Sequence, residues 1–232
     1  MAKVKTTKLD IIRCASELFF EQGYNATSPK HICEALDIST GNITYYFPTK
    51  EHLLAVFVEM LCDFQWEMME VEANEGVSSV LSVCLEMMSM AAMCEDSEIA
   101  KEFYLATYTS PICLEIIRRN DTKRNRQVFE QFCPEWTDSQ FVEAETIVSG
   151  IEYATLMTTA DSAPLETRIV GALNNILTVY QVPEEIRKVK IGKVLALDYR
   201  KIGRRVLSDF KNYIAQSNEA ALEELVSAKK NK

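Results

Sequence analysis

Residues 36–53, LDISTGNITYYFPTKEHL, gather hydroxyl, amide and phenol groups in a stretch that is too polar to be core. Threonine and asparagine side chains can bind phosphate oxygens or read the edges of bases, and a glycine such as Gly41 lets the backbone come close to a ligand. A tyrosine can bind a phosphate through its hydroxyl while its ring packs on a sugar or a thymine methyl. The chemistry that this stretch indicates is contact with a nucleic acid.

Two short helices are predicted to hold these groups in place. Ser28 followed by proline is typical of a helix start, and the helix that begins there is expected to stop near residue 36. After a turn of about three residues, a second helix is predicted over residues 40–47, where Pro48 ends it. Such a pair is a helix-turn-helix, whose second helix enters the major groove of DNA. The groove-facing candidates are Thr40, Gly41, Asn42, Thr44, Tyr45 and Tyr46.

Composition predicts an all-α fold for the whole chain. The 232 residues are 47% hydrophobic, and the 7 Gly and 6 Pro leave few turn formers for many short strands. Apolar periodicity predicts a first helix that ends at Gly23 and a long helix that opens at Thr49. Further helices are predicted over residues 76–94, 97–109, 111–132, 138–160, 164–181 and 184–216.

Charge is unevenly distributed along the chain. The formal net charge is −9, but residues 1–50 hold six Lys and Arg against five Asp and Glu, a net of about +1. The N-terminal segment is therefore the part that a polyanion such as DNA would repel least.

The sequence lacks the motifs of several other kinds of site. Seven scattered cysteines with no C-x-x-C pair fit reduced thiols in a cytosol, and with only two histidines a His/Cys zinc site is not expected. No signal peptide is evident. A membrane span needs about 18 consecutive uncharged apolar residues, and no segment is that long. There is no glycine-rich phosphate loop and no G-x-S-x-G. We expect a cytoplasmic protein that is not an enzyme and has no metal, no cofactor and no membrane partner.

A family resemblance rests on three motifs in order. They are the ELFFEQGYNATS helix end, the DISTGNITYYF turn and second helix, and the F-x-x-K-E-x-L-L opening of the next helix. Residues 6–55 therefore resemble the DNA-binding domain of the TetR-type (tetracycline-repressor-like) bacterial transcription regulators. The resemblance implies a helix-turn-helix domain over residues 1–49 that is joined, through a long fourth helix, to a larger helical ligand-binding and dimerisation domain over residues 50–232.

The resemblance also implies partners. Such regulators bind a near-palindromic operator in double-stranded DNA as homodimers, with the recognition helices in successive major grooves. It further implies phosphate contacts from Thr27, Ser28 and Lys30 at the start of the second helix, and from Lys50 at the start of the fourth.

Two positions depart from the family pattern. Asp37 stands where the family usually has glycine in the turn, but aspartate tolerates left-handed geometry, so the turn is expected to survive. Thr44 stands where the family commonly has an aromatic residue, and the aromatic pair is shifted to Tyr45 and Tyr46. The operator contacts are therefore expected to differ here, with Tyr46 as a phosphate candidate.

The larger part of the chain offers candidates for ligand and dimer contacts. A cavity lined by methionine and aromatic side chains could hold a flat or greasy organic effector. The ligand candidates are Phe57, Phe64, Trp66, Met88, Phe103, Tyr104 and Tyr108. Apolar stripes over residues 138–160 and 164–181 could form a four-helix bundle between two subunits or pack within one chain, and the resemblance favours dimerisation. The dimer candidates are Ile147, Ile151, Ala154, Ile169, Leu173 and Ile176.

The sequence thus favours a DNA-binding transcriptional regulator, a repressor that a small organic effector releases from its operator. One alternative is a DNA-binding regulator with no small-molecule effector, controlled by a protein partner or by cysteine oxidation. An enzyme is a more remote alternative. A fully packed larger domain would favour the first alternative, and a cavity of about 300 Å³ or more would favour an effector.

Overall fold

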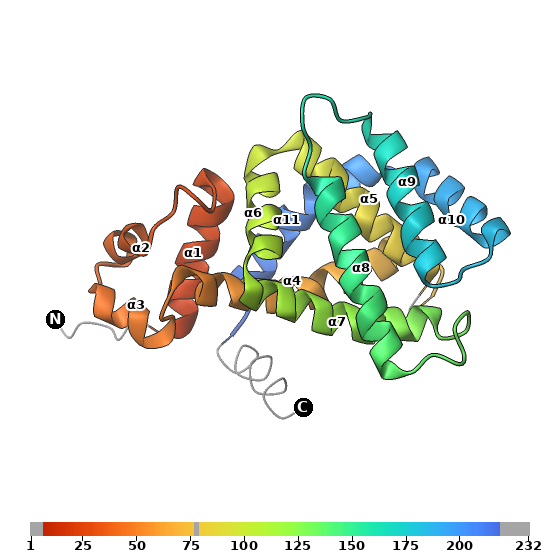
Figure 1. Cartoon of the computed structure of the whole chain (residues 1–232). Coiled ribbons are helices and arrows are strands. Elements are labelled where there is room, and N and C mark those ends of the chain that lie inside the picture. Colours follow the sequence, from red (N-terminus) through yellow and green to blue (C-terminus); the bar gives the residue numbers. More distant parts are fainter. Residues whose placement is uncertain (1–6, 77–78, 219–232) are drawn as a thin grey trace.

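The computed structural model describes residues 7–76 and 79–218. Within these ranges the chain forms eleven α-helices and no strand, so the predicted all-α fold is confirmed (Figure 1). The helices are α1 (Lys8–Gln22), α2 (Pro29–Leu36), α3 (Thr40–Tyr46), α4 (Lys50–Ala73), α5 (Val80–Asp96), α6 (Glu98–Thr109), α7 (Pro111–Phe129), α8 (Asp138–Leu156), α9 (Leu165–Val179), α10 (Glu184–Ala196) and α11 (Tyr199–Gln216).

The ends of the N-terminal helices follow from their capping residues. The Thr7 side chain accepts a hydrogen bond from the Asp10 backbone N–H at 3.2 Å, and the Asp10 carboxylate accepts one from the Thr7 N–H at 2.8 Å, which together fix the start of α1. Gly23 ends α1 with φ 97°, as predicted. Asp37 ends α2 in the left-handed region, with φ 50° and ψ 48°. The prediction that aspartate would preserve this turn is confirmed.

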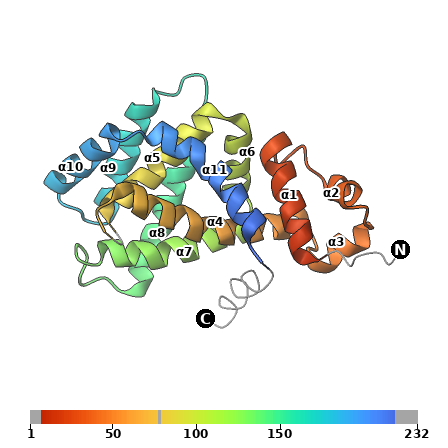
Figure 2. The same cartoon turned by 180° about the vertical axis from the view of Figure 1, so that it is seen from behind.

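Helix α4 joins the three N-terminal helices to the larger group. It spans 24 residues, begins beside α1 and α3, and continues along the lower side of the larger group, where it packs on α5, α7 and α11 (Figures 1 and 2). A displacement of the larger group can therefore reach the N-terminal helices through a single rigid element.

Helix α5 is the centre of the larger group. It contacts α4, α6, α8, α9, α10 and α11, and 13 of its 17 residues are buried. A helix that is covered on nearly all sides must be apolar all round, which explains the methionine-rich composition of this segment. Helix α11 crosses it closely, because a Cβ atom on Gly203 would lie 2.6 Å from the carbonyl oxygen of Ser89.

One predicted helix is wrong. Residues 184–216 form two helices, because Leu197 is extended and Asp198 caps a new helix, with its side chain accepting from the Lys201 N–H at 3.1 Å. Helix α8 also ends at Leu156, four residues before the predicted end. The division into domains after residue 49 stays a prediction.

The structure also shows the state of the cysteines and whether a described helix could span a membrane. All seven cysteines are free thiols, and six of them are buried. Among the described helices, none is long and apolar enough to cross a lipid bilayer.

Candidate functional site

Helix α3 presents most of its side chains to solvent. Ile43 is buried and anchors the helix, while Thr40, Gly41, Asn42 and Thr44 are exposed. Residues 40, 41, 44 and 45 share one face because neighbours on a helix surface are three or four residues apart. The structure therefore brings the predicted groove-facing groups together on one short exposed helix.

The two tyrosines of α3 differ in exposure. Tyr45 is 81% exposed, whereas Tyr46 is half-buried and packs on the core, with its ring centroid 4.9 Å from that of Tyr45 in an edge-to-face contact. The Thr44 hydroxyl turns back and donates to the carbonyl oxygens of Thr40 at 3.2 Å and Gly41 at 3.3 Å. Tyr45 is therefore the aromatic side chain with the longest free reach from this helix.

The three residues predicted to contact phosphate at the start of α2 differ in their exposure to solvent. Lys30 projects into solvent, with its side chain 77% exposed and its ammonium 3.6 Å from the Glu34 carboxylate. The Ser28 hydroxyl caps α2 by accepting from the His31 N–H at 3.3 Å. Thr27 is buried, and its hydroxyl donates to the Gly23 carbonyl oxygen at 2.9 Å. The prediction of a side-chain phosphate contact from Thr27 is corrected, because this side chain does not reach the surface.

Comparison with known proteins identifies this part of the chain. The family described as "Bacterial regulatory proteins, tetR family" matches residues 11–56. The HTH-type transcriptional regulator QacR of Staphylococcus aureus (strain Mu50 / ATCC 700699) is 45% identical over 51 residues, which are 22% of this chain and 26% of QacR. Residues 11–56 of the chain thus belong to the TetR family by sequence. The match thus spans about a quarter of the length of this curated relative.

The solved structures that are similar to this chain have low sequence identity to it. Full-length TylP, a TetR regulator from Streptomyces fradiae, is 16% identical, with a TM-score of 0.47 and 91% of each chain covered. A gamma-butyrolactone receptor (ArpA-like protein) is 16% identical, with a TM-score of 0.42, and the match covers 86% of this chain and 95% of the receptor.

The side chain of Lys50 points inward. Its ammonium donates to the Tyr24 carbonyl oxygen and lies 3.8 Å from the centroid of the Tyr24 ring and 5.8 Å from that of Phe19. Burial lowers the pKa of Lys50, although the nearby carboxylates of Glu102 and Glu51 act in the opposite direction. In this structure the ammonium of Lys50 holds α4 against the end of α1, and a phosphate contact from Lys50 stays a prediction.

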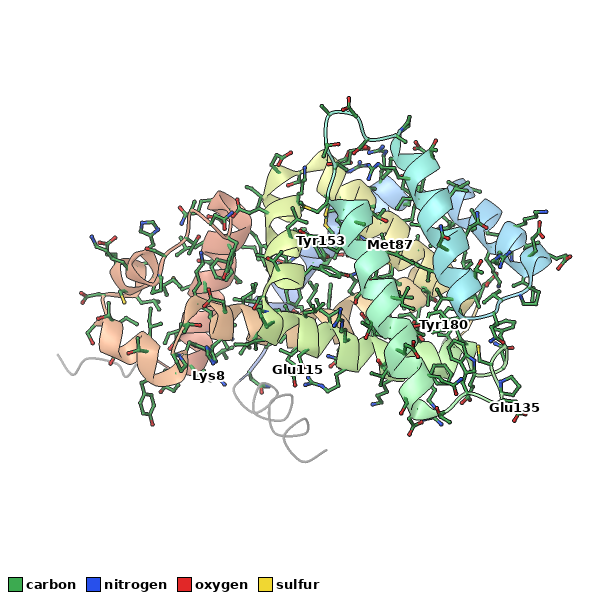
Figure 3. All side chains as sticks on the ribbon, in the orientation of Figure 1. Lys8, Met87, Glu115, Glu135, Tyr153 and Tyr180 are labelled. Carbon is green, nitrogen blue, oxygen red and sulfur yellow. The ribbon has the colours of Figure 1, made fainter. Side chains whose placement is uncertain are left out.

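An internal cavity lies between α4, α5, α6, α7 and α8, with a free volume of about 60 Å³. Its apolar wall consists of Val58, Leu61, Val83, Met87, Met90, Ile117 and Val148, and its polar wall includes Gln65, Glu86, Thr107, Asp121, Arg124, Asn125 and Glu152. The volume is below the roughly 300 Å³ of a usual ligand site, but the group is not fully packed either. In Figure 3, Met87 and Tyr180 both lie within this larger group, away from α1, α2 and α3.

Two of the predicted ligand residues, Tyr104 and Tyr108, line this cavity. The others do not. Phe57, Phe64 and Phe103 belong to an aromatic junction, here defined as these three rings with Phe19, Phe20 and Phe210. Met88 is fully buried core. These four side chains pack away from the cavity, and a ligand contact from any of them stays a prediction.

The aromatic junction connects the N-terminal helices to the larger group. Phe20 of α1 lies 5.2 Å from Phe103 of α6 and 6.1 Å from Phe210 of α11 between ring centroids, and Phe19 lies 5.4 Å from Phe57 of α4. Such edge-to-face contacts stabilise a fixed orientation of the packed helices. The position of α1 therefore depends on α4, α6 and α11 together.

Trp66 lies beside the cavity and not in its wall. The Arg124 guanidinium stacks over its ring at 4.5 Å, donates to the Glu86 carboxylate at 3.0 and 3.3 Å, and also pairs with Asp121. A surface depression lined by Trp66, Asn120 and Lys123 shares Cys62 and Arg124 with the cavity wall. Arg124 thus stands between this depression and the cavity. A ligand contact from Trp66 stays a prediction.

Three carboxylates gather beside the cavity, where Asp121 and Glu152 line its wall and Glu145 lies next to them. One oxygen atom from each of the three lies within 4.8 Å of the other two. Tyr108 donates its hydroxyl proton to Glu152 Oε2 at 2.8 Å. Burial, and secondly the neighbouring Asp121 charge, raise the pKa of Glu152 to about 8. The same two causes raise the pKa of Glu145 well above its ordinary value.

Sequence reasoning missed these carboxylates. Glu145 falls four residues after Phe141 and three before Val148, so it lies on the apolar face of α8, and its exposed fraction is 0%. A charge on an apolar helix face is the signal that could have found it.

The predicted dimer residues divide between two environments. Ile147, Ile151 and Ala154 of α8 are exposed or half-buried, and Ile147 is 50% exposed. The prediction for Ile169, Leu173 and Ile176 of α9 is corrected, because these side chains are buried in the core of their own chain.

Proposed function

We propose that this TetR-family protein is a sequence-specific DNA-binding regulator of transcription, a repressor that binds a near-palindromic operator in double-stranded DNA. The exposed face of α3, with Thr40, Asn42 and Tyr45, supports this proposal most directly. In a helix-turn-helix the second helix reads the major groove, while the N-terminus of the first and side chains such as Lys30 contact phosphates.

The proposed protein is a homodimer that uses α8. Ile147, Gly150, Ile151 and Ala154 follow the i, i+3, i+4, i+7 spacing of one helix face, and that face is exposed or half-buried. A glycine inside a helix costs about 1 kcal/mol relative to alanine. No described atom lies within 4 Å of the point where a Gly150 Cβ would stand, so nothing in this chain requires a glycine there. Close approach of a second subunit would require one.

A small organic effector would act through α6. Tyr104, Thr107 and Tyr108 of this helix line the cavity, while its Glu102 accepts a hydrogen bond from the Asn25 backbone N–H in the loop after α1. A drug-sized molecule needs a site of roughly 300 Å³ or more, whereas this cavity has a volume of about 60 Å³. Because the surrounding helices are closely packed, such a molecule must displace them in order to bind. Movement of α6 would shift Glu102 and the aromatic junction, change the separation of the two recognition helices, and release DNA.

Control by cysteine oxidation has less support. Burial is the largest cause of a raised pKa for six of the seven cysteines, and a thiol held in its protonated form reacts slowly. Control by a protein partner stays the alternative to an effector.

Selection of bound fragments from random duplex DNA by the full-length protein tests the proposal. We expect an inverted repeat with half-sites about one helical turn apart, or a multiple of it. Tyr45→Ala and Asn42→Ala should each lower the affinity for that site about tenfold or more, because each removes a contact in the groove. Asn212→Ala, at an exposed position on α11, is the matched control. Recovery of no common sequence, or full affinity in both α3 variants, would contradict the proposal.

A pair of lysine variants separates DNA contact from packing. Lys30→Met should reduce the slope of log K against log salt concentration by about 1 per subunit, because one phosphate contact is lost. Lys50→Met should leave that slope unchanged and lower the melting temperature, since the Lys50 ammonium binds Tyr24 inside the protein. Binding titrations at four or more salt concentrations measure the first effect, and thermal unfolding measures the second. An equal loss of slope in the Lys50 variant would support it as a phosphate contact.

A further inference from the structure

We propose that this cavity takes an organic cation, with the positive charge between Asp121, Glu145 and Glu152 and the apolar body against the methionine and aliphatic wall. The inference rests on the proposed function in that it names the class of the effector. It follows from three observations on the described residues: an imbalance of charge, an unpaired buried oxygen, and the composition of the wall.

The first observation is that the carboxylates outnumber the cations. Arg124 is the one cationic side chain that lines the cavity in the part of the chain that the structure describes, and it is already paired with Glu86 and Asp121. Glu145 and Glu152 receive hydrogen bonds from Asn125, Tyr180 and Tyr108, but these donors are neutral. The buried Glu145 and the half-buried Glu152 therefore have no cation of their own, and their ionised forms are costly in a protein interior.

The second observation is an oxygen atom with no donor. Glu145 Oε2 accepts from the Asn125 amide at 2.8 Å and from the Tyr180 hydroxyl at 3.2 Å. Glu145 Oε1 is buried and has no hydrogen-bond partner among the described residues. Leaving a buried acceptor unsatisfied costs roughly 1–3 kcal/mol. A positive group placed between this oxygen and the carboxylates of Asp121 and Glu152 would remove that cost.

The third observation is the apolar and aromatic composition of the cavity wall near the carboxylates. Met87, Met90, Ile117 and Val148 offer thioether and aliphatic surface, and Tyr104 and Tyr108 offer ring faces. A hard metal ion seeks six or more oxygen ligands and gains nothing from such surfaces. An alkylammonium or arylammonium gains from both parts, because its apolar body packs on the wall and its charge is attracted to carboxylates and aromatic rings.

The site also predicts a proton linkage. Glu152 faces Tyr108 of α6, Glu86 of α5, and Asp121 and Arg124 of α7, and Glu145, which accepts from Tyr180, lies next to it. Because the pKa of Glu152 is raised to about 8, this carboxyl group holds a proton at pH 7, and a bound cation would displace it. The affinity for a permanent cation should therefore rise with pH, by up to about tenfold per unit, until about pH 8.

Calorimetric titration of the full-length protein without DNA tests the inference. The probes are benzyltrimethylammonium, its uncharged carbon isostere neopentylbenzene, and magnesium chloride alone. We expect saturable binding of benzyltrimethylammonium, at least tenfold weaker binding of neopentylbenzene, and no saturable binding of magnesium. Glu145→Gln and Glu152→Gln should each weaken binding of the cation about tenfold. Glu143→Gln, an exposed carboxylate on the same helix, should leave it unchanged.

Thermal unfolding of the same variants shows whether they fold, because glutamine has the shape of glutamate and should preserve the melting transition. Equal binding of the cation and its isostere would overturn the inference. So would unchanged affinity in both glutamine variants, binding of magnesium in place of the organic cation, or no binding of any probe. A separate titration of the protein–DNA complex measures release. Cation binding without release would leave the inference standing and contradict the proposed effector mechanism.

Discussion

Replacing Ile147 by aspartate should convert the proposed dimer into monomers and weaken operator binding by about 10²–10⁴-fold. Ile147 is 50% exposed at the middle of the α8 face that carries Gly150, Ile151 and Ala154. In a two-fold symmetric interface the substitution would bring two unpaired carboxylates into the apolar contact, where a buried charge without a partner is strongly unfavourable. A monomer occupies one half-site and loses the gain from binding both together.

Sedimentation of Ile147→Asp at several concentrations measures the dissociation, and a titration of operator DNA measures the second effect. Val189→Asp on α10 is the matched control, because Val189 is 55% exposed and undergoes the same chemical change. The control should stay dimeric and keep its affinity. If Ile147→Asp remained a dimer, or if Val189→Asp dissociated to the same degree, the subunit contact would lie on another surface.

The proposed coupling between the cavity and the helix-turn-helix would have a physical basis, because few elements connect the two. The Glu102 carboxylate and the Phe103 ring are adjacent on α6, and both touch the end of α1 or the loop that follows it. The next residue, Tyr104, lines the cavity and donates its hydroxyl to Gln65 of α4 at 2.8 Å. One helical turn thus connects the cavity wall, the long fourth helix and the N-terminal helices.

Much of the fold could be predicted because helix ends depend on local chemistry. Ser28, Gly23 and Thr137 each begin or end a helix as the sequence indicates, through hydrogen bonds to residues three or four positions away or through a backbone angle that glycine favours. The break at Asp198 was missed because it falls inside a continuous apolar repeat. An aspartate there is equally compatible with the exposed face of one long helix until its capping bond to the Lys201 N–H is seen.

The candidate sites also differ in whether nearby or distant residues form them. The α3 surface could be predicted because seven residues carry both the buried anchor and the exposed groups. Lys50 and Glu145 could not be placed, because their environment is made by residues far away in sequence. Lys50 binds Tyr24, 26 residues earlier, and Glu145 binds Asn125, 20 residues earlier. Side chains whose partners come from other helices are set by tertiary packing and not by local pattern.

Glu152→Gln should change how the stability of the protein depends on pH. The pKa of Glu152 is raised from 4.5 to about 8, by burial and then by the Asp121 charge. Between about pH 5 and pH 8 the folded protein therefore holds a proton that the unfolded chain has lost, so stability falls as pH rises through this range. Above about pH 8 both states are ionised at this group, and the loss stops.

The glutamine variant cannot titrate at position 152, so its free energy of unfolding should fall less over the same range. Relative to the wild type, Glu152→Gln should be similar at pH 5 and more stable by roughly 2–4 kcal/mol at pH 8. Urea unfolding at pH 5, 6, 7 and 8, at one fixed protein concentration, measures the difference, with Glu143→Gln as the control on the exposed side of α8. Parallel curves for wild type and Glu152→Gln would mean that this carboxyl group is ionised in the folded protein. The charge imbalance would then be larger still at neutral pH, and cation affinity should lose its dependence on pH.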